Sequence, residues 1–182
     1  MIELKVFSLG AAERIPAHVY LGLIAAFCLG TILSLWLKGW REGLRYSALL
    51  LLMEWIFLVL GTCVIFRENG AECQVNLVPL ISYFDYGENS YFMEKAALNI
   101  LNVALFIPIG LLSGYGFRNI TWKRVLSIGA LLSVFIEILQ LILKCGLCEM
   151  DDVLHNAAGC MIGYGVYKLC SKLAEYVYME FL

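Results

Sequence analysis

The stretch SVFIEILQLIL, residues 133–143, carries a carboxyl group and a carboxamide within an otherwise apolar helix. Gln140 follows Glu137 by about one helical turn, so both side chains lie on one face. An ionisable group at a helix centre in the membrane costs roughly 2.5–3.5 kcal/mol, so it usually faces a protein interior and has a function. The stretch therefore predicts a membrane helix whose polar face turns toward other helices.

The composition of the whole chain is that of a membrane protein. Hydrophobic residues make up 62% of the 182 residues, charged residues only 15%, and the mean hydropathy is +0.81. A soluble domain of this length is far less apolar. We therefore predict an integral membrane protein.

Five stretches have the length and apolarity of a membrane crossing, which needs about 20 residues. They are residues 18–38, 46–66, 97–117, 125–144 and 152–170. The sequence thus predicts an all-α, polytopic helical bundle of about five transmembrane helices, forming a single membrane domain over residues 1–182. Residues 1–17 are too charged and too rich in glycine for a secretory signal, so no cleaved leader is expected.

The distribution of Lys and Arg predicts the orientation of these helices. One side of the membrane would hold eight of them: Lys38, Arg41, Arg45, Arg118, Lys123, Arg124, Lys168 and Lys172. The other side would hold five, spread over longer segments: Lys5, Arg14, Arg67, Lys95 and Lys144. The positive-inside rule then places the amino terminus outside, the carboxyl terminus in the cytoplasm, and residues 67–96 in an extracytoplasmic loop.

Polar side chains of the last three predicted spans lie at similar depths below the outer surface. Asn102 is five or six residues inward, Glu137 about seven, and Asn156 about four, at about 1.5 Å of rise per residue. Isolated polar groups are costly at that depth, whereas clustered ones satisfy each other. We therefore expect an outward-facing polar pocket.

Small residues predict which helices pack closely. Gly159 and Gly163 share a helix face with Asp152 and Asn156, at spacings of four, three and four residues. Glycines spaced in this way let the backbones of two membrane helices approach each other. Gly22 with Gly30, and Gly110 with Gly114, are candidates for the same role.

The outward segments are acidic, which suits cationic substrates or divalent metals. Solvated loop charges are the simpler interpretation for the long loop, and less so for the short turn, because its acids open a helix. The acids of the long loop are Glu68, Glu72, Asp85, Glu88 and Glu94, and those of the short turn are Glu149, Asp151 and Asp152. One of the two aspartates is a candidate amino-terminal cap of the last helix.

A zinc site would need His155 together with Cys145 and Cys148, but the paired motifs of structural zinc sites are missing. We therefore predict no metal and no cofactor. Cys73, Cys145 and Cys148 face a compartment in which disulfides can form, so a bridge from Cys73 to the turn, or within the turn, is a further hypothesis.

Three segments follow one another in the second half of the chain. They carry Asn102, Phe106, Pro108 and Gly110; then Ser133, Glu137 and Gln140; then Asp152, Asn156, Gly159 and Gly163. The segment NLVPL, with Asn76 and Pro79, lies upstream of them. In this order and spacing the segments resemble the VanZ-like family of small bacterial membrane proteins, whose usual upstream motif is Asn-Leu-Ile-Pro-Phe, so the resemblance covers residues 76–165.

The resemblance implies a multi-pass protein of the bacterial cytoplasmic membrane. The family is named for a protein that lowers susceptibility to the glycopeptide teicoplanin, so it also implies an association with such resistance. Members often place an arginine in the turn before the aspartate pair, where this chain has Lys144 and Cys145. A lysine lacks the planar two-point grip of a guanidinium on a carboxylate or phosphate.

Two functions from different classes fit these residues. The first is a nonenzymatic membrane factor whose pocket binds an envelope lipid, a lipid-linked wall precursor or an amphiphilic antibiotic. Its partners would be membrane lipids; nucleic acid is disfavoured, since no basic exterior patch exists beyond the topology signals, and protein partners are unknown. The binding residues would be Asn102, Ser133, Gln140, Asp151, His155 and Asn156.

The second function is a membrane enzyme in which Glu137 acts as general acid or base and Asp152 orients a substrate or water. A proton-coupled transporter using Glu54 and Glu137 is a third hypothesis. The structural alternative for Glu137 is a protonated side chain packed against an asparagine. Pro108 bends its helix, which serves either architecture or the shape of the site.

Overall fold

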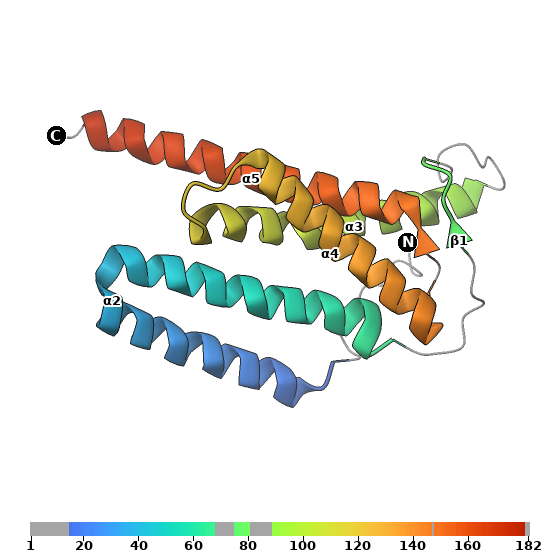
Figure 1. Ribbon diagram of the computed structural model, residues 1–182, viewed down its shortest axis with the longest axis horizontal. Helices are drawn as coiled ribbons and strands as arrows, with labels where there is room; N and C mark the ends of the chain where they lie inside the picture. Colours follow the sequence, from blue (N-terminus) through green and yellow to red (C-terminus); the bar gives the residue numbers. More distant parts are fainter. Residues whose placement is uncertain (1–14, 68–74, 81–88, 147, 181–182) are drawn as a thin grey trace.

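The computed structural model describes residues 15–67, 75–80, 89–146 and 148–180 and is all-helical apart from one short strand pair (Figure 1). The predicted all-α class is thus confirmed. In chain order the elements are α2 (Ala17–Leu60), the π-helical turn η1 (Gly61–Ile65), β1 (Val75–Asn76), α3 (Asn89–Gly116), α4 (Trp122–Leu143), β2 (Cys148–Glu149) and α5 (Met150–Glu180).

Helix α2 folds back on itself at Gly39. Its backbone there has φ 73° and ψ 176°, a conformation that glycine adopts without steric cost. Across the fold, the Ser34 hydroxyl donates to the Gly43 carbonyl at 3.1 Å and lies 3.2 Å from the Ser47 hydroxyl. The two arms therefore run antiparallel (Figure 1), in the places where spans 18–38 and 46–66 are predicted.

Among the described residues, three helices are long and apolar enough to cross a membrane: Ala17–Ile65, Lys95–Gly116 and Trp122–Leu143. They cover the first four predicted spans, because the folded helix α2 with η1 contains two of them. Helix α5, the fifth predicted span, is less apolar because His155, Asn156 and several glycines and tyrosines dilute its aliphatic residues.

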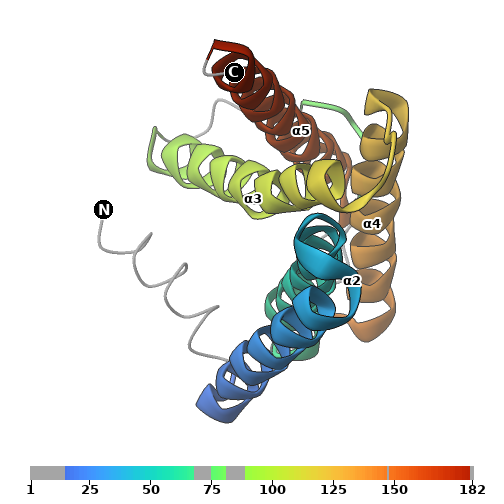
Figure 2. The same cartoon turned by 90° about the vertical axis from the view of Figure 1, so that its left-hand side faces the viewer.

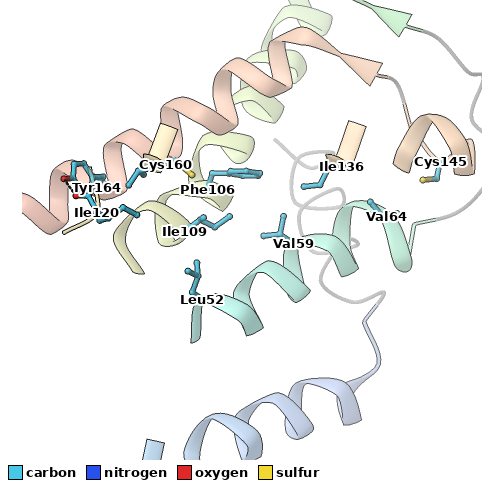
Figure 3. Close-up of a cluster of buried hydrophobic side chains, with 11 residues drawn as sticks. Leu52, Val59, Val64, Phe106, Ile109, Ile120, Ile136, Cys145, Cys160 and Tyr164 are labelled. Atoms are coloured by element: carbon cyan, nitrogen blue, oxygen red, sulfur yellow. Dashed lines mark hydrogen bonds between the residues drawn. The ribbon is translucent and has the colours of Figure 1, made fainter. Parts of the chain in front are cut away.

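The hydrophobic core joins the second arm of α2 to α3, α4 and α5. Leu52 and Val59 of α2 face Phe106 and Ile109 of α3, and Ile136 of α4 lies in the same cluster (Figure 3). The first arm of α2 contributes no buried residue to this core and lies at the edge of the bundle (Figure 2). Its exposed apolar side chains suit contact with lipid.

Glycines bring α3 and α5 into backbone contact. A Cβ atom at Gly110 would overlap the Cys160 carbonyl group, and one at Gly163 would overlap the Ile107 carbonyl oxygen. The close approach predicted from the spacing of the glycines on α5 is confirmed, as Gly159 meets the backbone of α3 in the same way.

The other glycine pairs differ in their surroundings. Gly114 lies against the Tyr167 ring of α5, and Gly30 lies against the Leu50 side chain of the second arm. Gly22 has no neighbour within 4 Å of an added Cβ. Within the described part of the chain the expectation of close packing is therefore wrong for Gly22, because the first arm meets no described helix there.

A two-residue parallel strand pair places the NLVPL segment beside the start of α5. Val75 pairs with Cys148, and Asn76 pairs with Glu149. The Asn76 side chain accepts a hydrogen bond from the Val78 N–H at 3.3 Å, which stabilises the turn toward Pro79. The Leu80 N–H then donates to the Asp151 carboxylate, so this segment is tied to the first turn of α5.

We expect Gly163→Ala to lower the free energy of unfolding by about 1–3 kcal/mol, because the methyl group would force α5 away from α3. The matched control is Gly165→Ala, where an added Cβ has nothing within 4 Å. That variant should be neutral or stabilising by up to about 1 kcal/mol. Unfolding in mixed micelles of mild detergent and SDS measures both, and equal losses would contradict the close contact.

Candidate functional site

A cavity of about 300 Å³ lies at the end of the bundle where α2 and α4 end and α3 and α5 begin (Figure 1). Its apolar lining residues include Leu98, Leu101, Leu105, Phe106 and Ile136. Its polar and charged lining residues include Arg67, Lys95, Asn99, Asn102, Glu137, Gln140, Glu149, Asp152 and Asn156. The polar residues predicted from α3, α4 and α5 are thus brought together around one space.

Glu137 reaches the cavity from α4 and is only 4% exposed. Helix α4 ends at Leu143 because Lys144 takes a left-handed conformation, with φ 52° and ψ 45°. The chain then turns back over the helix, so the Glu149 N–H donates to Glu137 Oε2 at 3.0 Å. The carboxyl group is thereby held in place by the backbone of the following turn.

Asp152 and Asn102 connect α5 to α3. The Asn102 side-chain amide donates to Asp152 Oδ1 at 2.7 Å. Since both residues line the cavity, this bond fixes one carboxylate on its wall while leaving Oδ2 without a hydrogen bond to a described residue.

Asn156 and Gln140 connect the remaining elements. The Asn156 side-chain amide donates to the Ser133 hydroxyl of α4 at 2.8 Å, and Ser133 is fully buried beneath the cavity lining. The Gln140 amide donates to the Cys63 carbonyl oxygen of η1 at 3.1 Å. Each of these polar side chains therefore serves in the packing of the bundle as well as in the cavity wall.

Several polar lining residues were missed by the sequence reasoning. The Lys95 ammonium lies 2.6 and 2.7 Å from the two carboxylate oxygens of Glu149, which links α3 to β2. Asn99, one turn before Asn102, also lines the cavity. Lys95 begins the apolar part of α3 directly after the long loop, and only its position at that boundary could have indicated a role.

Arg67 is a further missed residue. A Cβ atom at Gly146 would lie 3.1 Å from Arg67 Nη1 and 3.2 Å from Gln140 Cδ, so the guanidinium packs against the turn after α4. Arginine is expected in that turn from the family resemblance, and this chain has Lys144 and Cys145 there. The guanidinium instead arrives from the end of η1, at the first residue of the predicted loop.

Other predicted binding residues lie outside the cavity wall. Asp151 is 2% exposed and accepts the hydrogen bond from Leu80, so it fixes the entry to α5. His155 Nδ1 lies 2.5 Å from the Asp151 carbonyl oxygen. Pro108 lies within α3, where the Trp55 indole donates to the nearby Leu105 carbonyl at 2.8 Å.

The remaining predictions concern a disulfide, a metal site and Glu54. Cys145 is a buried free thiol, so the bridge within the turn is not formed; Cys73 lies outside the described residues. Glu68, Glu72, Asp85 and Glu88 lie outside them as well. In the described part of the chain no group of three His, Cys, Asp or Glu is placed to hold a metal ion. Glu54 does not line the cavity, and its buried Oε1 atom has no hydrogen-bond partner among the described residues.

These features define a helical protein with membrane-compatible helices and a polar cavity at one end. The chain belongs to the VanZ/LLP1 family, whose model matches residues 19–171, well beyond the predicted motif region of 76–165. It is similar to the protein VanZ of Enterococcus faecium, with 30% identity over 99 residues. The match covers 51% of this chain and 62% of that relative. No solved structure matches.

The bond between Asn102 and Asp152 can be measured with a double-mutant cycle. Asn102→Ala and Asp152→Ala should couple by about 1–3 kcal/mol in the free energy of unfolding, because either change alone removes the partner of a polar group. The control pairs Asn102→Ala with Ser34→Ala in the α2 fold, where the losses should add within about 0.5 kcal/mol. A coupling below that value for the first pair would contradict the bond.

Proposed function

We propose that this protein crosses the bacterial cytoplasmic membrane five times and binds an amphiphilic envelope molecule in the cavity. The ligand would be a lipid, a lipid-linked wall precursor or an amphiphilic antibiotic. The observation that carries the proposal is a cavity lined both by polar side chains, most of them from α3, α4 and α5, and by apolar side chains. Such a mixed lining is typical of sites that orient a ligand by a few polar contacts.

The proposed topology is supported by the two short basic turns. Arg118 donates to Glu42 at 2.5 Å, and the Arg45 side chain donates to the Gly116 carbonyl oxygen at 3.2 Å. Residues 38–45 and 118–124 therefore lie at one end of the bundle, away from the cavity. The positive-inside rule makes this end cytoplasmic, so the cavity would open on the extracytoplasmic side.

The size of the cavity favours recognition of a headgroup. A volume of about 300 Å³ is at the lower end of the range for ligand sites, which runs to about 1,000 Å³. The apolar lining residues Leu98, Leu101, Leu105 and Phe106 share one face of α3 and would continue the contact along an acyl chain. A polar headgroup in the cavity with its apolar part beside α3 fits this arrangement.

The association with resistance comes from the family. The matched relative is named VanZ, and the chain spans 62% of it, so the whole relative's activity is carried over as a proposal only. Binding of a lipid or of the antibiotic itself at the outer surface would lower the amount of teicoplanin that reaches its target. Reduced susceptibility to teicoplanin is the cellular effect that we propose for this chain.

An enzyme is the second candidate, because Glu137 and Asp152 line the same cavity. One carboxyl group could exchange a proton with a bound lipid while the other orients it. A proton path through Glu54 is less favoured, since Glu54 lies outside the cavity lining. Lipid profiles of cells with and without the protein separate these candidates, because an enzyme yields a modified lipid and a binding protein does not.

We expect Glu137→Gln and Asp152→Asn to fold and to reduce protection against teicoplanin at matched expression. Loss of a charged acceptor should weaken ligand binding by about tenfold or more. Glu137→Leu should also destabilise the protein by about 1–3 kcal/mol, because the Glu149 N–H loses its acceptor.

The control is Glu175→Gln near the exposed end of α5, which should leave protection unchanged. The inhibitory concentration of teicoplanin in a host that lacks the protein is the measurement. Full protection by both Glu137→Gln and Asp152→Asn would show that the cavity carboxylates have no part in the function.

A further inference from the structure

Arg67 lines the cavity, and its guanidinium has no polar partner among the described residues. It makes no ion pair with a carboxylate and no side-chain hydrogen bond to any described residue, although it packs against Gly146 and Gln140. The other cation of the cavity, Lys95, already contacts both carboxylate oxygens of Glu149. Of the two described cations that line the cavity, Arg67 is therefore the one that remains available to a ligand.

A guanidinium offers a planar fork of N–H donors that matches the oxygens of phosphate and carboxylate groups. A second unused donor lies in the same wall, because Asn99 is 4% exposed and its side-chain Nδ2 has no partner among the described residues. Buried donors are normally satisfied, so the buried Asn99 amide and the half-buried Arg67 guanidinium are two lining donors with which an oxyanion can pair.

The cavity also contains carboxyl oxygens that lack a hydrogen-bond donor among the described residues. Glu137 Oε1 and Asp152 Oδ2 accept no hydrogen bond from the described residues, and the buried Asn156 Oδ1 also lacks a donor. With Lys95 and Glu149 compensating each other, the cavity presents one unpaired positive group and two carboxyl groups. A ligand that carries both an anionic and a cationic group with N–H donors complements this arrangement.

We propose that the cavity binds an aminoalkyl phosphate headgroup of a membrane lipid, with the phosphate on Arg67 and the primary ammonium on Glu137 and Asp152. This inference rests on the proposed function and narrows its ligand to one class. The aliphatic wall beside the polar groups favours a lipid over a soluble aminoalkyl phosphate. A purely anionic headgroup leaves the carboxyl groups without donors, and a quaternary ammonium offers them no N–H.

The test uses the full chain in detergent micelles and native mass spectrometry with three lipids of identical acyl chains. Phosphatidylethanolamine should bind about tenfold or more tightly than phosphatidylcholine or phosphatidylglycerol. Soluble phosphoethanolamine should compete weakly. Equal binding of the three lipids would overturn the role of the ammonium. If soluble phosphoethanolamine competes as strongly as the lipid does, the inference that the ligand is a lipid would be overturned.

Variants of the lining residues test which side chain binds the phosphate and which binds the ammonium. Arg67→Gln should weaken binding of phosphatidylethanolamine by about tenfold or more, and Arg67→Lys by less, because the charge remains while the fork is lost. Glu137→Gln should reduce the preference for phosphatidylethanolamine over phosphatidylcholine. Arg41→Gln, at an exposed position outside the cavity, is the control and should bind as the unmodified protein does.

The variants of Arg67 should unfold at the same SDS content as the unmodified chain, since no ion pair is lost. Unchanged lipid binding by Arg67→Gln would overturn the inference. If that occurs while Glu137→Gln and Asp152→Asn still abolish protection against teicoplanin, the proposed function stands with another ligand. If those two variants keep full protection, the proposed function itself fails.

Discussion

Backbone contact between α3 and α5 is the constraint on which the cavity depends. Gly110 and Gly163 let the two helices meet with carbonyl groups where side chains would otherwise stand. This contact fixes the distance between the polar faces of α3 and α5, so Asn102 can reach Asp152 at 2.7 Å. Larger side chains in place of the glycines would separate the two helices. The Asn102 amide and the Asp152 carboxylate would then lack a partner in an apolar bundle, which is costly.

The polar groups around the cavity divide into those that the protein satisfies and those that it leaves open. Bonds from Asn156 to Ser133 and from Gln140 to Cys63 hold the helices together and would be needed without any ligand. Asn99 Nδ2 is buried without a partner among the described residues, and Arg67 packs against the turn after α4 without a hydrogen bond to a described residue. A buried polar group without a partner lowers stability, so these open donors favour a ligand over a purely structural role.

Much of the fold could be predicted because it follows from local composition and spacing. Apolar stretches predict the helices, and the spacing of Gly159 and Gly163 predicts their close approach to another helix. The convergence of Asn102, Glu137 and Asn156 follows from their similar depth, and Asp152 shares a helix face with Asn156. Arg67 and Lys95 could not be assigned in this way, because they flank a long loop whose path is not encoded by periodicity. Asp151 was misplaced because its bond to Leu80 depends on the strand pair, a contact between distant segments.

The groups that line the cavity come from elements that differ in how much they contribute to the packing of the bundle. Most of the carboxyl groups and amides come from α3, α4 and α5, where bonds such as Asn102 to Asp152 also join the helices. Arg67 follows η1; it packs against the turn after α4 but makes no side-chain hydrogen bond to a described residue. A change at Arg67 therefore alters what the cavity attracts with little effect on the bundle, whereas a change in the polar faces of the helices alters both. Ligand preference in this architecture can thus vary at the loop ends while the glycine contact and the polar faces maintain the fold.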